Sequence, residues 1–233
     1  MSLADTVALV TGGTGTLGRA VALAFLEAGA RVTVSYRGPA GRDVLVAAVP
    51  AAARARLQAV AADVTDGDGV GRLLAETTAH HGRLDALVNV AGGFAPGGLG
   101  DTDEGTWDAM LALNLRSAFL CCRAALPALR AAGGGRVVNV ASRAVVPPAG
   151  GFLAYTVAKS GVIALTQALA HELRPHRIAV NAVLPSTMDT AANRRAMPDA
   201  DRAAWVQPGT VAGVIRWLAS PEAAGVTGTL VTV

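Results

Sequence analysis

The stretch that decides the fold runs from Thr6 to Gly18 and reads TVALVTGGTGTLG. Its first part, Thr6–Thr11, is a short apolar and β-branched run that predicts a buried strand. The Ala-rich segment Leu17–Ala28, closed by Gly29, predicts a helix. The glycines between them permit a tight turn, and the N–H groups exposed at a helix start attract phosphate. A glycine-rich turn also suits an ordinary surface loop, but its place between a strand and a helix favours dinucleotide binding.

Seven strand-like runs alternate with about six helical segments. Each run is apolar on both faces, which is typical of strands covered by helices on each side of a parallel sheet. No linker, composition break or repeat divides the chain, so we expect one domain over residues 1–233. The pattern predicts an α/β fold with a Rossmann-type, doubly wound, parallel seven-stranded sheet and helices on both faces. The predicted strands are Thr6–Thr11, Arg31–Tyr36, Leu57–Ala61, Leu84–Val90, Arg136–Ala141, Arg177–Leu184 and Gly228–Val233.

The composition narrows the class of protein. Of the 233 residues, 52% are hydrophobic and 16% are charged, which excludes a disordered chain. The net charge of +3 comes from 19 arginines and one lysine, Lys159, and no window of sequence gathers four or more of them. Nucleic-acid and membrane-surface partners need such a cluster, so we expect neither.

The cysteines, histidines and N-terminal residues predict a cytoplasmic protein without a metal. Cys121 and Cys122 are adjacent, a spacing that rarely forms a disulfide, and we interpret them as reduced thiols. The N-terminus has no secretory signal pattern, and no apolar run reaches the roughly 18 residues of a membrane span. The four histidines lack metal-ligand spacing.

The glycine turn resembles that of the short-chain dehydrogenase/reductase family, Thr-Gly-x-x-x-Gly-x-Gly. Thr16 stands where the family usually has its middle glycine. Because a β-branched residue limits positive φ, we expect a locally shifted turn in which the Thr14 or Thr16 hydroxyl donates to phosphate. The resemblance implies cofactor contacts from Gly12, Thr14, Gly15, Thr16, Leu17 and Gly18.

Motifs after later strands extend the resemblance. Asp63-Val64 resembles the family's Asp-Val pair at the adenine, and Asn89-Val90-Ala91-Gly92 resembles its Asn-Asn-Ala-Gly motif at the adenosine ribose. After the sixth predicted strand, Ser186 replaces a glycine that the family often has. The resemblance implies further cofactor contacts from Pro185 and from Thr187 or Thr190.

The end of the second predicted strand bears on the choice of nicotinamide cofactor. An acidic residue there accepts from the ribose hydroxyls and repels the 2′-phosphate of NADP(H), whereas an arginine attracts that phosphate. The chain reads Val34-Ser35-Tyr36-Arg37-Gly38, and the next acidic residue is Asp43. We interpret Arg37 as favouring NADP(H) over NAD(H), the alternative being an ordinary solvated arginine.

Tyr155 and Lys159 suit acid–base chemistry. The two residues lie four apart in a predicted helix and therefore share one face. A carbonyl that accepts a hydride must also gain a proton. Tyrosine, whose free pKa is about 10, becomes a better acid when a neighbouring ammonium and a nicotinium charge lower that pKa. The alternative is an ordinary surface helix with amphipathic residues.

Asn114 and Ser142 complete the catalytic set of the family, in its order and with close to its spacing. The resemblance implies that Tyr155 is the general acid in reduction and the base in oxidation. It implies that Ser142 hydrogen-bonds the substrate oxygen and that Lys159 binds the nicotinamide ribose, so Tyr155 and Lys159 also count as cofactor contacts. Asn114 would hold a water that links Lys159 to solvent.

The family's substrate loops correspond to residues near 92–105, 143–153 and 185–208, and we expect substrate contacts from Gly93, Phe94 and Arg143. The expected function is hydride transfer between NADPH and a carbonyl or alcohol, by a homodimer or homotetramer. The run at 91–94 and Thr16 resemble the dihydropteridine-reductase-like members more than the 3-oxoacyl reductases. The other alternative is a non-catalytic NAD(P)-binding sensor or scaffold.

Tyr36→Asp tests the cofactor preference. The new carboxylate would repel a 2′-phosphate, so we expect the ratio of kcat/KM with NADPH to that with NADH to fall roughly tenfold or more. Tyr36→Asn removes the same ring without adding a charge and serves as the control. An NADPH/NADH ratio that is equal in both variants and the parent would contradict the assignment.

Overall fold

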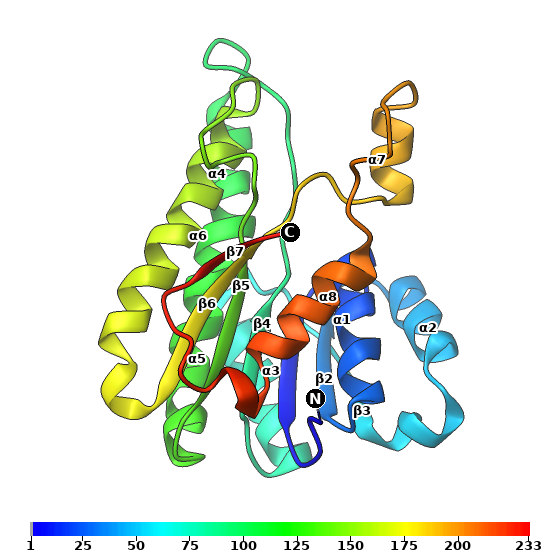
Figure 1. The fold of residues 1–233 in the computed structure, drawn as a ribbon, viewed down its shortest axis with the longest axis vertical. Helices are drawn as coiled ribbons and strands as arrows, with labels where there is room; N and C mark the ends of the chain where they lie inside the picture. Colours follow the sequence, from blue (N-terminus) through cyan, green and yellow to red (C-terminus); the bar gives the residue numbers. More distant parts are fainter. Residues whose placement is uncertain (1) are drawn as a thin grey trace.

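The computed structural model describes residues 2–233, which contain a parallel sheet of seven strands (Figure 1). The strands are β1 (Val7–Thr11), β2 (Arg31–Tyr36), β3 (Leu57–Ala61), β4 (Ala86–Asn89), β5 (Gly135–Val140), β6 (Ile178–Leu184) and β7 (Leu230–Thr232). Their order in the sheet is β3-β2-β1-β4-β5-β6-β7. This order confirms the predicted Rossmann-type α/β fold. It puts the topological switch point, where ligands bind in such sheets, at the carboxyl ends of β1 and β4.

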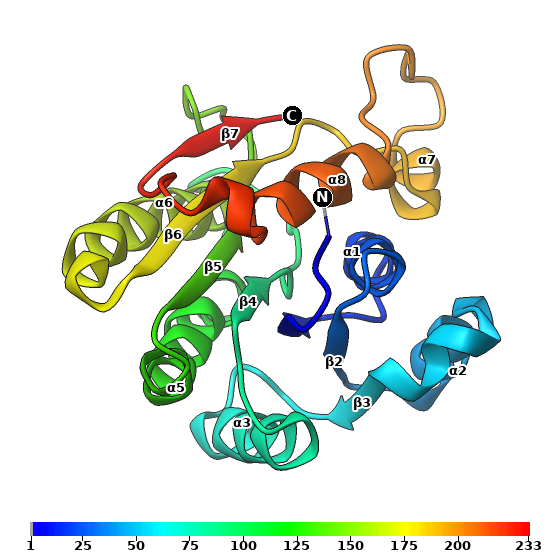
Figure 2. The same ribbon diagram turned by 60° about the horizontal axis from the view of Figure 1, so that its bottom comes forward.

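Helices cover both faces of the sheet (Figure 2). One face carries α1 (Thr16–Glu27), α2 (Pro39–Ala48) and α8 (Pro208–Leu218), and the other carries α3 (Gly67–His81), α5 (Ser117–Ala131) and α6 (Leu153–Glu172). A π-helical segment, Ala112–Arg116, joins α4 (Glu104–Leu111) to α5. The short helix α7 (Ala191–Ala196), orange in Figure 1, stands away from the sheet.

Buried aliphatic side chains hold the three layers together. Every residue of β1, β4 and β6 is buried, as the apolar runs predicted. One cluster lies between the sheet and the α1–α8 layer and includes Phe25 and Ile215. A second lies on the opposite face and includes Leu73 and Leu129. Each such side chain contributes about 1.5–3 kcal/mol when fully buried, so the two clusters fix the strand ends that form the switch point.

The strand β4 is shorter than the predicted strand Leu84–Val90, and side-chain hydrogen bonds occur at both of its ends. At its amino end, the Asp85 carboxylate accepts from the Val7 N–H at 2.9 Å. At its carboxyl end, the Val90 N–H donates to Thr11 Oγ at 3.1 Å. The Asp85 backbone still bonds to both neighbours, because its N–H donates to the Val7 carbonyl and its carbonyl accepts from the Arg136 N–H, both at 2.9 Å.

The segment predicted as a loop over 185–208 contains α7. Thr190 Oγ accepts from the Asn193 N–H at 3.1 Å and caps the helix start. Six residues are too few for a clear hydrophobic period, so the sequence pattern left this helix unpredicted.

Two helical stretches, Glu104–Ala131 and Leu153–Glu172, are long and apolar enough to cross a membrane by length and composition alone. Both pack against the sheet (Figure 2). Core helices of globular proteins pass the same test, so this is weak evidence for a membrane span.

Leu87 and Leu99 form a matched pair for testing the core. Leu87 lies in the middle of β4 and is fully buried, whereas Leu99 is 84% exposed. We expect Leu87→Ala to lower the free energy of unfolding by about 2–5 kcal/mol and Leu99→Ala to change it by at most about 0.5 kcal/mol. Urea denaturation measures both, and equal losses would contradict the described packing.

Candidate active site

A hollow of about 540 Å³ opens at the carboxyl ends of β1 to β4. The turn between β1 and α1, the ends of β2 and β3, and the segment after β4 all line it. Residues from four separate strand ends thus come together at the switch point. The predicted cofactor residues that line the hollow are Gly12, Thr14, Gly15, Thr16, Leu17, Gly18, Arg37, Asp63, Val64, Ala91 and Gly92.

The turn between β1 and α1 has no space for a side chain at Gly12, Gly13 or Gly18. Gly12 has a φ of +63°, and a Cβ there would lie 2.9 Å from Cα of Ala91. A Cβ on Gly18 would overlap the Gly12 carbonyl oxygen. The Gly12 N–H donates to Ser35 Oγ at 3.0 Å, and the Ala91 N–H donates to Thr11 Oγ at 3.1 Å. These contacts hold the backbone of β1, β2 and β4 close together beneath the hollow.

Thr16 is the first residue of α1, and the N-cap residue Gly15 is extended with a φ of −70°. Because neither position has a positive φ, the backbone gives no reason for the turn shift that the sequence predicted. Thr14 and Thr16 both line the hollow. No side chain in the described range caps α1, so the N–H groups of its first turn are available to an anion.

Arg37 and Asp63 carry opposite charges in the hollow. Asp63 Oδ1 accepts from the Thr65 N–H at 2.9 Å and from the Thr65 hydroxyl at 2.7 Å. These bonds lower the pKa of Asp63, and the charge of Arg37 adds to the effect. Asp63 is the one acidic side chain among the described lining residues, and Tyr36 and Arg37 follow one another at the end of β2. The structure therefore presents a guanidinium at this strand end.

Five predicted cofactor residues lie outside the described lining of the hollow: Asn89, Tyr155, Lys159, Pro185 and Thr187. The Asn89 side chain is buried, and its Nδ2 donates to Asn139 Oδ1 on β5 at 2.8 Å. Asn89 is thus part of the core between β4 and β5.

The sequence did not predict the other lining residues as cofactor contacts. Met188 reaches the hollow because the loop after β6 folds back: the Asn193 Nδ2 donates to the Met188 carbonyl at 2.8 Å. That path depends on contacts within the folded loop. The further lining residues that the sequence did not assign as contacts are Ser35, Tyr36, Gly38, Gly41, Ala62, Val90 and Leu113.

The π-helical segment between α4 and α5 positions Asn114, which is 2% exposed. Its Oδ1 accepts from the Gly93 N–H and its Nδ2 donates to the Met110 carbonyl, both at 3.1 Å. A Cβ on Gly92 would lie 2.7 Å from Asn114 Oδ1 and 3.3 Å from Lys159 Nζ. Asn114 and Lys159 therefore meet directly behind a residue that lines the hollow. Such π segments are frequent at functional sites.

Lys159 is 5% exposed, and its Nζ donates to the Val140 carbonyl at the end of β5 at 2.7 Å. No ion pair to Lys159 occurs within residues 2–233. Burial without a counter-charge lowers the pKa of Lys159 to about 8. Lys159 thus loses its charge at a lower pH than a solvated lysine does.

Tyr155 lies one turn before Lys159 on the same face of α6. Burial raises the pKa of its phenol, and its interaction with the Ser142 hydroxyl opposes this increase. Lys159 Nζ lies 6.0 Å from the centre of the Tyr155 ring. The sequence predicted a lowered pKa under the combined charge of Lys159 and a nicotinium. In the protein alone the effect of burial on the pKa of Tyr155 outweighs that of Ser142, so the lowering stays a prediction for the cofactor complex.

An aromatic cluster surrounds Tyr155. The Phe94 ring centre lies 5.2 Å from that of Tyr155 and 5.6 Å from that of Phe152, and the Phe152 and Tyr155 rings are 6.1 Å apart. Phe94 is 60% exposed. An apolar, partly open surface therefore adjoins the phenol.

Hydrogen bonds join the loops that carry these side chains. The Gly97 N–H donates to the Gly151 carbonyl and the Leu153 N–H donates to the Gly97 carbonyl, both at 2.8 Å. The Arg143 N–H donates to the Pro185 carbonyl at 3.0 Å, which ties the loop after β5 to the loop after β6. The Arg143 side chain is exposed. The three predicted substrate loops thus meet at one edge of the sheet.

The hollow fits a dinucleotide. Its bare glycine backbone permits close approach, and the uncapped start of α1 and the Arg37 guanidinium supply the donors that phosphates require. Across residues 2–233, no group of three or more histidine, cysteine or acidic side chains could hold a metal ion.

Comparisons with known proteins agree with this geometry. The family model for short chain dehydrogenases matches residues 6–201. The chain belongs to the short-chain dehydrogenase/reductase family. Proteins of this family are oxidoreductases that use nicotinamide cofactors, and this chain is such an oxidoreductase.

Relatives match the chain over nearly its whole length. It is 36% identical to a 3-oxoacyl-[acyl-carrier-protein] reductase from Synechocystis over 234 residues, which are 97% of this chain and 94% of that protein. It is 33% identical to the human dehydrogenase/reductase SDR family member 4 over 242 residues, covering 99% of this chain and 87% of that protein. A short-chain type dehydrogenase/reductase from Mycobacterium ulcerans superposes with a TM-score of 0.94 at 29% identity, covering 100% of this chain and 90% of that one.

The buried Lys159 predicts a specific pH dependence of stability. Its pKa is about 8 in the folded chain and about 10.5 in the unfolded chain, so the unfolded state binds more protons between these values. Relative to Lys159→Met, the wild type should gain up to roughly 3 kcal/mol of unfolding free energy as the pH rises from about 8 to 10.5.

Denaturant unfolding of both proteins across this pH range measures the difference. The Met variant keeps the length of the side chain but has no titrating group there. All other ionisable groups are the same in both proteins, so their effects cancel in the difference between the two unfolding free energies. Parallel pH profiles for the two proteins would contradict the burial of an unpaired ammonium.

Proposed function

We propose that the protein is an NADP(H)-preferring carbonyl reductase or alcohol dehydrogenase. The observation that carries this proposal is the position of Tyr155 between Ser142, Lys159 and the open aromatic surface, beside a hollow suited to a dinucleotide. When bound, the cofactor supplies or accepts the hydride. The protein's own side chains move the proton, stabilise the developing charge and orient the cofactor.

Tyr155 moves the proton. In reduction, its hydroxyl donates to the substrate oxygen as negative charge develops there, and in oxidation its phenolate accepts that proton. The Ser142 Oγ accepts from the Ala144 N–H at 3.2 Å, which holds the hydroxyl beside the Tyr155 phenol, where it can donate to the substrate oxygen. A fixed donor of this kind stabilises the developing charge.

Lys159 orients the cofactor ribose and adjusts the acidity of Tyr155. Its bond to the Val140 carbonyl holds the ammonium behind Gly92, at the edge of the hollow. Asn114 lies beside it with its amide orientation fixed by backbone groups. This arrangement supports a role for Asn114 in delivering a proton to Lys159 through water.

The preference for NADP(H) rests on Arg37. Arg37 lines the hollow directly after β2, and the acidic side chain nearest to it in the hollow, Asp63, has its Oδ1 engaged by Thr65. A guanidinium there suits the 2′-phosphate.

Phe94 and Phe152 favour a substrate with a flat or apolar group next to the carbonyl. Their rings flank the phenol on its open side, where aromatic contacts contribute about 0.5–1.5 kcal/mol beyond burial. Aryl ketones and quinones meet this description.

We also propose a cytoplasmic homodimer. Phe119 on α5 and Val157 on α6 are 43% and 38% exposed, and a second copy of the chain could cover them.

Tyr155→Phe tests the assigned proton transfer. The variant keeps the ring and removes the hydroxyl, so we expect kcat for ketone reduction to fall by about 10²- to 10⁴-fold. NADPH affinity, measured by fluorescence titration of the same protein, should stay nearly unchanged and serves as the control for folding. Retained turnover with intact NADPH binding would contradict proton transfer by Tyr155.

A further inference from the structure

A second hollow, larger than that of the candidate active site, lies at the opposite end of the sheet. Its volume is about 740 Å³, within the range of small-molecule pockets. Its walls come from the amino ends of β1, β4, β5 and β6, and from the segment that follows α8. Neither the proposed reaction nor the cofactor uses this end of the fold.

The lining of this hollow carries an excess of positive charge. Four arginines line it, Arg83, Arg136, Arg174 and Arg177, against the two acidic residues Asp5 and Asp85. The fold gathers these four arginines from three separate segments, those at or just before the starts of β4, β5 and β6. Asp5 belongs to none of the ion pairs within residues 2–233.

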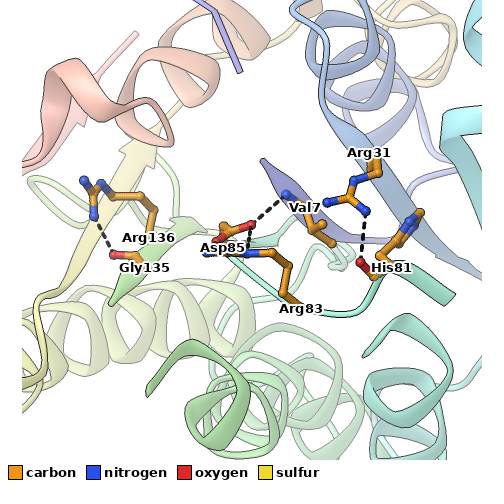
Figure 3. A network of polar contacts seen from close by, with 7 residues as sticks. All are labelled: Val7, Arg31, His81, Arg83, Asp85, Gly135 and Arg136. Carbon is orange, nitrogen blue, oxygen red and sulfur yellow. Dashed lines mark hydrogen bonds and ion pairs between the residues drawn. The ribbon is translucent and has the colours of Figure 1, made fainter. Parts of the chain in front are cut away.

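Asp85 is fully engaged and cannot neutralise the other arginines. Arg83 binds it with two nitrogens, Nη2 at 2.7 Å and Nε at 2.9 Å from Oδ1. Its second oxygen accepts from the Val7 N–H at 2.9 Å. Figure 3 shows the Arg83–Asp85 pair at the start of β4, with the Arg136 guanidinium turned away from it.

Arg136 is the unusual group of this hollow. It is half-buried at the start of β5, and its Nη1 donates to the Gly135 carbonyl at 2.9 Å (Figure 3). Its Nε is buried and has no hydrogen-bond partner among the described residues. Burial lowers the pKa of this guanidinium, as expected for a charge without a counter-ion. A buried, unpaired donor on a cation is costly unless a ligand or water satisfies it.

Arg174 and Arg177 stand at the rim of the same hollow. Both are exposed, and no described carboxylate pairs with either. The backbone beneath them is held rigidly, because the Gly135 N–H donates to the Arg177 carbonyl at 3.1 Å. A Cβ on Gly134 would lie only 2.6 Å from that carbonyl oxygen. The guanidiniums of Arg136, Arg174 and Arg177, none with an acidic partner among the described residues, thus lie around a rigid segment of backbone.

We propose that this hollow, at the amino ends of the strands, binds a small phosphate-bearing anion with at least two negative charges. Arg136 supplies a half-buried guanidinium in the wall of the hollow, and Arg174 and Arg177 supply the rim charges. Guanidinium forks match phosphate oxygens in pairs, which makes a phosphate or pyrophosphate group the fitting ligand. The size of the hollow leaves room for an organic group attached to it.

Calorimetric titration with inorganic pyrophosphate tests this site. The protein is first saturated with NADP⁺ or NAD⁺, whichever binds more tightly, so that the phosphate positions of the cofactor hollow are filled. Ionic strength is held constant with sodium chloride, because exposed charges are screened by salt. We expect one pyrophosphate to bind per chain, and citrate to bind more weakly at the same ionic strength.

Variants locate the bound anion. Arg136→Gln should weaken pyrophosphate binding about tenfold or more, because a hydrogen bond to a charged group is lost. Arg174→Gln, at an exposed position that does not affect folding, should weaken it several-fold. Arg72→Gln removes the same charge from an exposed position on α3, outside the hollow, and should leave the dissociation constant unchanged.

Three results would overturn the proposal. They are the absence of pyrophosphate binding to the cofactor-saturated protein, equal weakening by Arg72→Gln and Arg174→Gln, and citrate binding as tight as that of pyrophosphate. The last would show a general anion site without preference for phosphate.

Discussion

The close contact between the Gly12 backbone and Ala91 is the constraint on which both halves of the site depend. Gly12 follows β1 and Ala91 follows β4, and a Cβ on Gly12 would lie 2.9 Å from the Ala91 Cα. The contact keeps the floor of the dinucleotide hollow free of side chains. It also fixes Gly92, the next residue, above Asn114 and Lys159. The proposed cofactor contacts and proton-transfer groups are therefore held by the same two strand ends.

Burial shifts the pKa values of Tyr155 and Lys159 in opposite directions. It raises the pKa of Tyr155 and lowers the pKa of Lys159 to about 8, because each neutral form is favoured away from water. The protein alone thus holds Tyr155 as a neutral phenol, ready to donate a proton. A cationic nicotinamide nearby would favour the phenolate, which is the form that oxidation requires.

The sequence predicted the fold and most of the hollow because these depend on local patterns. Apolar runs marked the strands, and the Gly12 to Gly18 turn marked the switch point. Four-residue spacing placed Tyr155 and Lys159 on one helical face. The π segment at Asn114 and the path of Met188 depend on packing between distant segments, which no local pattern records.

Asn89 illustrates how a resemblance identifies a motif without settling where each side chain points. The residue follows the family's order, yet its Nδ2 bonds to Asn139 in the core. The arginines show likewise that the sequence alone does not reveal where charges gather in the fold. Arg83 and Arg136 are far apart in the sequence and neither lies in a basic run, but parallel strands bring their amino ends to one hollow.

Transfer of deuterium tests the assignment as an NADP(H)-dependent reductase most directly. NADPH labelled with deuterium at both hydrogens of nicotinamide C4 is mixed with excess enzyme and a series of aryl ketones, and the masses of the products are measured by mass spectrometry after one turnover. We expect at least one ketone to yield an alcohol that carries a single deuterium on the former carbonyl carbon. Binding of the labelled NADPH without deuterium in any product would contradict the assignment and favour a non-catalytic dinucleotide-binding protein.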